Sequence, residues 1–250
     1  MKKIAFFVIA SIGVLSCSKK NSEKVNLALH LDKGFEQTLV YTLSTEENKN
    51  GGMNESTEVR YKVDSVDKDG NYYLTGEIVR MSFNQKMFGE SISYDSRDEN
   101  AVDESGLAAE IKPVLNNPFT FKINKHGEII EKQKFQKEVS GGLDAEPYNI
   151  IPLQFPRENI EVGFKWKENV ANPLLKSAKA QTEYTYNGTN ENRIEILLNS
   201  TITGIPMTKD SKIAGKFVFD SKTGILISGE RTMPIQLGGG TATFKIIPVN

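Results

Sequence analysis

The sequence has few of the side chains that most often carry catalysis or bind metals. Its 250 residues include one cysteine, Cys17, one tryptophan, Trp166, and two histidines, His30 and His126. One cysteine cannot form an intramolecular disulfide, and the two histidines lie too far apart in sequence for a local zinc motif. We therefore predict surface histidines without a role, no metal site and no cofactor. We interpret Trp166 as a core or barrel-end residue rather than a platform for a ligand.

Catalytic motifs are also absent. The sequence has no G-x-S-x-G elbow, phosphate-binding loop, H-E-x-x-H helix or dinucleotide fingerprint. A glycosidase would need two positioned carboxylates, and the spacing of the many acidic residues singles out no pair. The sequence therefore predicts a protein that is not an enzyme.

Long apolar runs are absent except at the N-terminus. Lys2 and Lys3 precede an apolar stretch over residues 4–15, which is shorter than the roughly 20 residues that a membrane-spanning helix needs. A basic start, a short apolar stretch and a small residue are typical of a secretory signal. The first residues therefore predict export from the cytoplasm.

The cysteine follows this signal directly. Val14-Leu15-Ser16-Cys17 resembles the lipobox of bacterial lipoproteins, whose cysteine sulfur receives a diacylglyceryl group before the peptide is cut ahead of it. The resemblance implies a lipoprotein signal peptide over residues 1–16, lipid attachment at Cys17 and a flexible tether over residues 17–26. An ordinary signal cut after Ser16 is the alternative, but it leaves the cysteine without a partner. Two or more acyl chains give stable membrane anchoring.

The composition of the remaining chain favours a β protein. Residues 17–250 carry 29 basic and 32 acidic side chains, a formal charge of −3, which argues against a nucleic-acid partner or a polybasic membrane surface. The 13 Phe and 8 Tyr residues favour pleated, half-buried surfaces. This length is sufficient for a hydrophobic core.

Apolar and polar residues alternate along most of the chain after Val25, for example over Leu27–Leu31 and Val59–Val63. Alternation with period two predicts half-buried strands, and turns such as Asp69-Gly70 join neighbouring strands into antiparallel meanders. The predicted fold is mainly β, with two antiparallel meander sheets or half-barrels. One or two short helices are expected near residues 105–116, where Pro113 limits their length.

The pattern begins again in the second part of the chain. Glu161–Trp166 has a sequence pattern similar to that of Asp32–Phe35, and Phe217–Asp220 has one similar to that of Phe119–Phe121. We divide the chain into a first β half (27–140), a connector (141–160) and a second β half (161–250). An internal duplication explains the recurrence. The alternative is that any two meanders share alternation and turn glycines.

Two acidic segments are candidate ion sites. Asp67–Asn71 begins like a calcium loop, but its glycine is misplaced and a strand follows, so a hairpin turn is predicted. The acidic loop Asp95–Glu104 is a better candidate, although runs of charge are usually solvated.

A set of turns and strand starts resembles a family of Bacteroidota lipoproteins that have an uncharacterised β-rich domain. The residues are Gly34-Phe35, Tyr61–Val63, Val66–Tyr72, Ser93–Ser96, Pro118–Phe121, Gly127–Ile129, Phe155-Pro156 and Val162–Trp166. The resemblance covers most of residues 27–250 and implies no catalytic centre. Gly163-Phe164 departs from the Gly-Asp pair that is usual in this family before the tryptophan.

The tether adds an expectation about location. Surface-exported lipoproteins of such bacteria tend to carry acidic residues just after the cysteine, whereas Ser18–Lys24 contains three lysines and one glutamate. We therefore expect a protein anchored by lipid in the outer membrane of the cell envelope, facing the periplasm.

Two functions remain open. In the first, the lipoprotein is a non-catalytic module that binds an apolar or amphipathic ligand inside curved sheets. In the second, it is a structural or interaction lipoprotein that docks an envelope protein or a glycan without a ligand cavity. A continuous apolar cavity of several hundred Å³ favours the first, and a core filled with side chains favours the second. The sequence identifies no ligand-binding residues.

Overall fold

The computed structural model describes residues 24–47, 51–87, 90–98, 107–139, 148–171, 179–203, 210–235 and 239–249. The predicted signal peptide, the predicted lipid-attachment residue Cys17 and most of the predicted tether lie outside the described residues.

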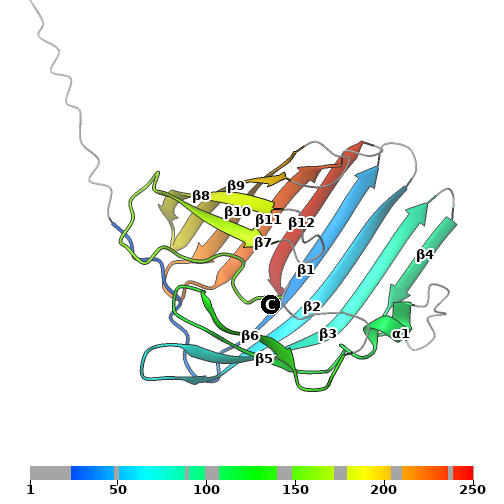
Figure 1. Ribbon diagram of the computed structural model, residues 1–250, viewed down its shortest axis with the longest axis horizontal. Coiled ribbons are helices and arrows are strands. Elements are labelled where there is room, and N and C mark those ends of the chain that lie inside the picture. The colour runs from blue at the N-terminus through cyan, green and yellow to red at the C-terminus, as the bar shows by residue number, and fades with distance from the viewer. Residues whose placement is uncertain are drawn as a thin grey trace, which may run out of the picture.

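The described residues are mainly β-strands (Figure 1). The strands are β1 (Glu36–Glu47), β2 (Gly51–Val66), β3 (Tyr72–Met87), β4 (Glu90–Asp95), β5 (Phe119–Ile123), β6 (Ile129–Phe135), β7 (Lys165–Ala171), β8 (Lys179–Asn190), β9 (Arg193–Thr203), β10 (Ser211–Asp220), β11 (Leu226–Pro234) and β12 (Gly240–Val249). Within the segment where helices were expected, the described part contains the five-residue helix α1 (Leu107–Ile111). Over the described ranges, no helix has the length and apolarity to cross a bilayer.

All twelve strands belong to one open antiparallel sheet. Its hydrogen-bonded order is β6-β5-β3-β2-β1-β12-β11-β10-β9-β8-β7, and β4 pairs with β3. The first and last strands pair from Thr38 with Val249 to Glu47 with Gly240. The structure therefore has one sheet where the sequence predicted two. Alternation predicts each strand, but it does not show that the two ends of the chain pair with each other.

The two halves of the sheet share a strand order. The runs β1-β2-β3-β5-β6 and β7-β8-β9-β10-β11 follow each other in the same sense, and β12 lies between them. Gly34 N donates to Val63 O at 2.8 Å, and Gly163 N donates to Tyr186 O at the same distance. Both glycines have a positive φ, 88° and 90°. This is the arrangement that a duplicated unit would produce.

The extended segment before β1 joins the two halves without being a strand of the sheet. Leu27, Leu29 and Leu31 are buried, as the alternation predicts. However, Leu29 N donates to Lys125 O at 2.7 Å in the β5–β6 turn, and His30 N donates to Thr223 O at 2.8 Å in the β10–β11 turn. The predicted half-buried strand is thus an extended segment that binds one turn of each half.

The connector completes the core. Its buried side chains are Ile150, Ile151, Leu153, Phe155 and Ile160. They pack with the extended segment against the inner face of the sheet, where Leu39, Val59 and Tyr61 are fully buried. This end of the sheet is therefore filled by the protein's own side chains.

The β5–β6 turn corrects the prediction for His126. Its side chain is buried, whereas a surface position was predicted, and burial lowers the pKa of its imidazole. Its carbonyl accepts a hydrogen bond from Phe155 N at 2.8 Å. The ring itself bonds to the backbone of Leu27, so long-range packing on this turn, which local sequence does not encode, accounts for its burial. His30 is exposed, as predicted.

Substitution of Gly224 tests the contact between the extended segment and the second half. A Cβ at Gly224 would lie 2.2 Å from Ala28 O, whereas a Cβ at Gly70 would meet no atom within 4 Å. Both residues have a positive φ, so alanine is strained by about 1–2 kcal/mol at either position. We expect Gly224→Ala to lower the free energy of unfolding by about 1–3 kcal/mol more than Gly70→Ala, because it also overpacks. Urea unfolding measures this difference, and equal losses would contradict the contact.

Candidate functional site

The face of the sheet opposite the core carries two rows of small polar side chains. In the first row, Thr42 pairs with Ser56, Ser56 with Ser82, and Ser82 with Asp95. In the second row, the paired residues are Ser44, Asn54, Asn84 and Ser93. Neighbouring strands lie about 4.8 Å apart, so each row presents polar groups at a regular spacing.

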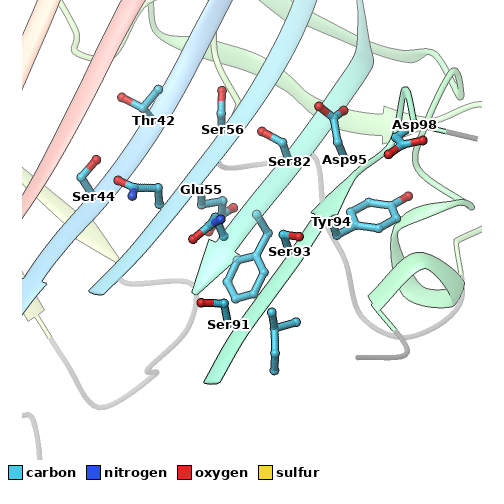
Figure 2. A pocket seen from close by; sticks show the side chains of 14 residues that line it. Thr42, Ser44, Glu55, Ser56, Ser82, Ser91, Ser93, Tyr94, Asp95 and Asp98 are labelled. Atoms are coloured by element: carbon cyan, nitrogen blue, oxygen red, sulfur yellow. The ribbon is translucent and has the colours of Figure 1, made fainter. Parts of the chain in front are cut away.

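These rows line a depression of about 660 Å³ across β1, β2, β3 and β4 (Figure 2). The lining residues are Thr42, Ser44, Asn54, Glu55, Ser56, Ser82, Phe83, Asn84, Ser91, Ile92, Ser93, Tyr94, Asp95 and Asp98. Among them, Glu55, Phe83 and Tyr94 pair in a row that alternates with the two polar rows and has the phase of the inner face. A serine or threonine hydroxyl donates one hydrogen bond and accepts others, and an asparagine amide also does both. The depression can therefore match a ligand that carries alternating donors and acceptors.

A β-bulge places the two rows on the same face. Ile78 pairs with Val59 on the inner face, but the register shifts between Glu58 and Val59, and Arg80 then pairs with Glu58. The extra residue in β3 reverses the alternation, since a bulge sets two residues of one strand against one of its partner. As a result, Ser82 faces outward although it shares the even-numbered phase of the buried residues Leu74 and Ile78.

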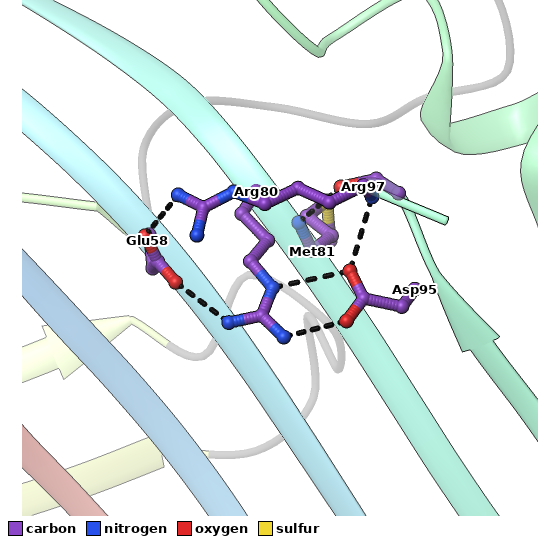
Figure 3. A network of polar contacts seen from close by, with 6 residues as sticks. Glu58, Arg80, Met81, Asp95 and Arg97 are labelled. Atoms are coloured by element: carbon purple, nitrogen blue, oxygen red, sulfur yellow. Dashed lines mark hydrogen bonds and ion pairs between the residues drawn. The ribbon is translucent and has the colours of Figure 1, made fainter. Parts of the chain in front are cut away.

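An ion network holds one end of the depression (Figure 3). Arg80 Nε donates to Asp95 Oδ1 at 3.1 Å, and its Nη2 donates to Asp95 Oδ2 at 2.5 Å. The Nη1 of the same guanidinium donates to Glu58 Oε1 at 3.0 Å, and Arg97 Nη2 donates to Glu58 Oε2 at 2.7 Å. A bidentate arginine–carboxylate pair fixes both groups in orientation.

The network also sets the ionisation of Asp95. The hydrogen bond from Arg80 holds the pKa of the Asp95 carboxyl below its ordinary value, and the backbone N–H of Arg97 contributes in the same direction. Asp95 therefore stays negatively charged and immobile at the rim of the depression. The following turn is fixed too, because Ser96 N donates to Met81 O at 2.9 Å and Met81 N donates to Ser96 Oγ at 3.0 Å.

On the inner face, Trp166 helps to fasten the connector to the edge of the sheet. Its Nε1 donates to Gln154 O at 2.9 Å, and Gln154 N donates to Glu168 Oε1 at 2.6 Å. The indole ring stacks on Tyr184 with a centroid distance of 5.4 Å. Burial raises the pKa of the Glu168 carboxyl to about 7. Trp166 thus packs at the edge of the core, in agreement with its interpretation from the sequence.

The structure places the sequence candidates in different situations. Cys17 lies outside the described residues, as do the last residues of the acidic loop. Asp67 forms the predicted hairpin turn, in which its backbone N donates to Asn71 O at 3.0 Å. Nowhere in the described ranges do three or more His, Cys, Asp or Glu side chains form a metal-binding group. The polar rows were not among the sites predicted from the sequence, although Ser, Thr and Asn at alternate positions of adjacent strands are a signal for them.

Comparison with known proteins gives one family match. Residues 69–145 match the model of a family of unknown function, DUF6263. For this segment, the match agrees with the expected uncharacterised domain, and it names no activity. Comparison with curated proteins found no match.

Comparison with solved structures found a crystal structure described as a "putative lipoprotein" from Parabacteroides distasonis ATCC 8503. The sequence identity is 10%, the alignment covers 88% of this chain and 97% of the other, and the TM-score is 0.33. A similarity of this size supports no conclusion about fold or function.

Substitution of Arg80 tests whether the network fixes this end of the sheet. Because the Arg80 side chain is about one-third exposed, we expect Arg80→Ala to cost only about 1 kcal/mol of stability. Lys216→Ala is the matched control, since Lys216 pairs with Glu195 at 3.0 Å but is half exposed, and it should cost less than about 0.5 kcal/mol. Chemical denaturation at pH 7 measures both values.

The pH dependence of the Arg80→Ala deficit provides a second check. A depressed pKa stabilises the fold above the unfolded pKa of about 4, and this contribution is lost as the pH falls through the folded pKa. The deficit should therefore shrink below pH 4. A deficit that stays constant to pH 2 would show that the Asp95 pair does not account for it.

Proposed function

We propose that this chain is a lipid-anchored lipoprotein of the cell envelope whose non-catalytic β body docks a hydroxyl-rich ligand, a glycan, on the outer face of β1–β4. The depression of about 660 Å³ carries this proposal. Its two rows combine hydroxyl, amide and carboxylate groups, which are the partners that sugar hydroxyls need as donors and acceptors.

The rigidity of the depression supports the same function. Its floor is the hydrogen-bonded ladder of four adjacent strands, and the Asp95 carboxylate at its rim accepts two hydrogen bonds from the Arg80 guanidinium. Groups that are held in place before binding lose little conformational entropy when a ligand arrives. A surface that offers few apolar contacts can therefore still bind a polar ligand with useful affinity.

The filled core favours docking over enclosure of a ligand. The connector and the segment before β1 occupy the inner face beside Leu39, Val59 and Tyr61, where the sequence predicts an apolar ligand inside curved sheets. A glycan on the outer face needs no such space.

Substitution of Ser82 tests glycan docking. We expect the full chain in mild detergent to bind envelope polysaccharides on a glycan array, and Ser82→Arg to weaken binding at least tenfold, because its long side chain fills the depression and removes a hydroxyl. A loss of this size corresponds to about 1.4 kcal/mol.

Thr201→Arg is the matched control for Ser82→Arg. Thr201 is also half-buried on a strand, but it lies on β9, away from the depression. It should leave binding unchanged. Equal binding by the wild type and Ser82→Arg would rule out this depression as the site, and a wild type that binds no glycan would favour a protein partner instead.

Substitution of Cys17 tests the anchor. When cells are fed an alkyne-tagged fatty acid, the wild type should become labelled and stay in the membrane fraction. Cys17→Ala should lose the label and leave that fraction, because the thiol is the proposed acceptor, and Ser18→Ala should behave as wild type. Label retained in Cys17→Ala would refute lipidation at this residue. Protease added to intact cells should leave the protein uncut if it faces the periplasm, and release of the β body would place it on the surface.

A further inference from the structure

The inner face changes from buried to accessible along the central strands. In one cross-strand row, Thr57, Tyr41, Ile246 and Phe217 are buried. In the next row, Glu55, Leu43, Phe244 and Arg231 are all at least partly exposed. In the row beyond it, Met53, Thr45, Ala242 and Met233 pair in turn, and all four are partly exposed, as is Ile213 on β10. The filled core therefore ends at the first row, and an accessible apolar strip follows it across β2, β1, β12, β11 and β10.

Arg231 is the cation of this strip. Its guanidinium carbon lies 4.2 Å from the centroid of the Phe244 ring. Over the described ranges it forms no ion pair, whereas the outward neighbour Glu230 on the same strand pairs with Lys245 at 3.4 Å. Gly215 pairs with Arg231 across β10 and β11. The absence of a side chain at Gly215 leaves room for the Arg231 side chain, since a Cβ at Gly215 would lie 2.8 Å from Arg231 Cβ.

Arg231 is exposed to solvent but is surrounded by many protein atoms. The side chain is exposed to solvent, yet the protein atoms around it are numerous enough that burial lowers the pKa of its guanidinium. An arginine remains charged even so. A charge that is partly desolvated and has no carboxylate partner gains more from an arriving anion than one that is fully hydrated.

We propose that the inner-face strip binds a single-chain amphiphile with a carboxylate head, such as a long-chain fatty acid, and that Arg231 holds the head. Charge complementarity selects the head group, because the planar fork of a guanidinium matches a carboxylate with two parallel hydrogen bonds. The alkyl chain lies along Leu43, Phe244 and Met233, and its burial supplies most of the affinity. This site is on the opposite face from the glycan depression and does not depend on it.

The carboxylates of the inner face are compatible with such an anion. Glu55 and Glu168 are the acidic side chains of the described inner face near this strip, and burial raises the pKa of each. By strand pairing, Glu55 is three strands from Arg231, across β12 and β1. Glu168 lies on the edge strand β7 and accepts the hydrogen bond from Gln154. Neither carboxylate forms an ion pair with Arg231 within the described residues, and Tyr184, which interacts electrostatically with Arg231, hydrogen-bonds Glu168.

Photocrosslinking of the full chain in lipid nanodiscs tests the proposal. The probes are a diazirine-labelled dodecanoate and the matching dodecanol, and mass spectrometry maps the labelled peptides. We expect dodecanoate to label peptides from β1, β11 and β12, and excess unlabelled dodecanoate to compete. Dodecanol should label the same peptides about tenfold less, because it lacks the charge that pairs with Arg231.

Variants of Arg231 separate head-group recognition from partitioning into lipid. Arg231→Gln should reduce dodecanoate labelling of these peptides about tenfold, and Arg231→Lys should retain an intermediate level because it keeps the charge but loses the fork. Arg193→Gln, at an exposed arginine where β9 begins, should leave labelling unchanged. Thermal melting must show that each variant is folded.

Three results would overturn the proposal. They are wild-type labelling confined to other peptides, equal labelling by dodecanol and dodecanoate, and undiminished labelling in a folded Arg231→Gln variant. If Arg231→Gln does not fold, labelling of Arg231→Lys is compared with labelling of the wild type instead. If these two proteins are labelled equally by dodecanoate and equally by dodecanol, the result counts against head-group recognition.

Discussion

The pairing of the first strand with the last is the interaction on which the rest of this structure depends. It runs from Thr38 with Val249 to Glu47 with Gly240. Without it, β1 and β12 would each present a row of unpaired backbone groups, and the two meanders would be separate sheets with additional edges. With it, a single surface has β7 as its edge at one end and β6 and β4 as its edges at the other. The segment before β1 adds a second link, since it bonds to a turn of each half through Leu29 and His30.

A single surface of this length has two faces with different chemistry. Near the segment before β1, the inner face is filled with side chains. Farther along the strands its apolar residues are accessible and Arg231 lies among them. The outer face carries hydroxyl and amide rows, and the guanidinium of Arg80 fixes the carboxylate at their end. The proposed glycan site and the proposed amphiphile site are therefore separated by the thickness of the sheet and can be tested independently.

Much of the fold is readable from local pattern. Period-two alternation and turn residues such as Asp67–Asn71 identify strands and hairpins, because side chains of a strand point to opposite faces and a tight turn needs particular backbone angles. The burial of Leu27, Leu29 and Leu31 follows from the same alternation. Their partners do not, because turns nearly 100 and 200 residues later in the chain supply the hydrogen bonds.

The candidate site lies at the limit of what local pattern can predict. The sequence by itself determined the strand-forming segments, their turns, the lack of catalytic motifs and the resemblance of Val14–Cys17 to a lipobox, since each of these depends on neighbouring residues. Only the tertiary structure decided that the sheet is single, that a bulge before Arg80 turns Ser82 outward, and that Arg231 lies over Phe244. These features depend on register and on pairing between distant strands, and a shift of one residue reverses the face on which every later side chain lies.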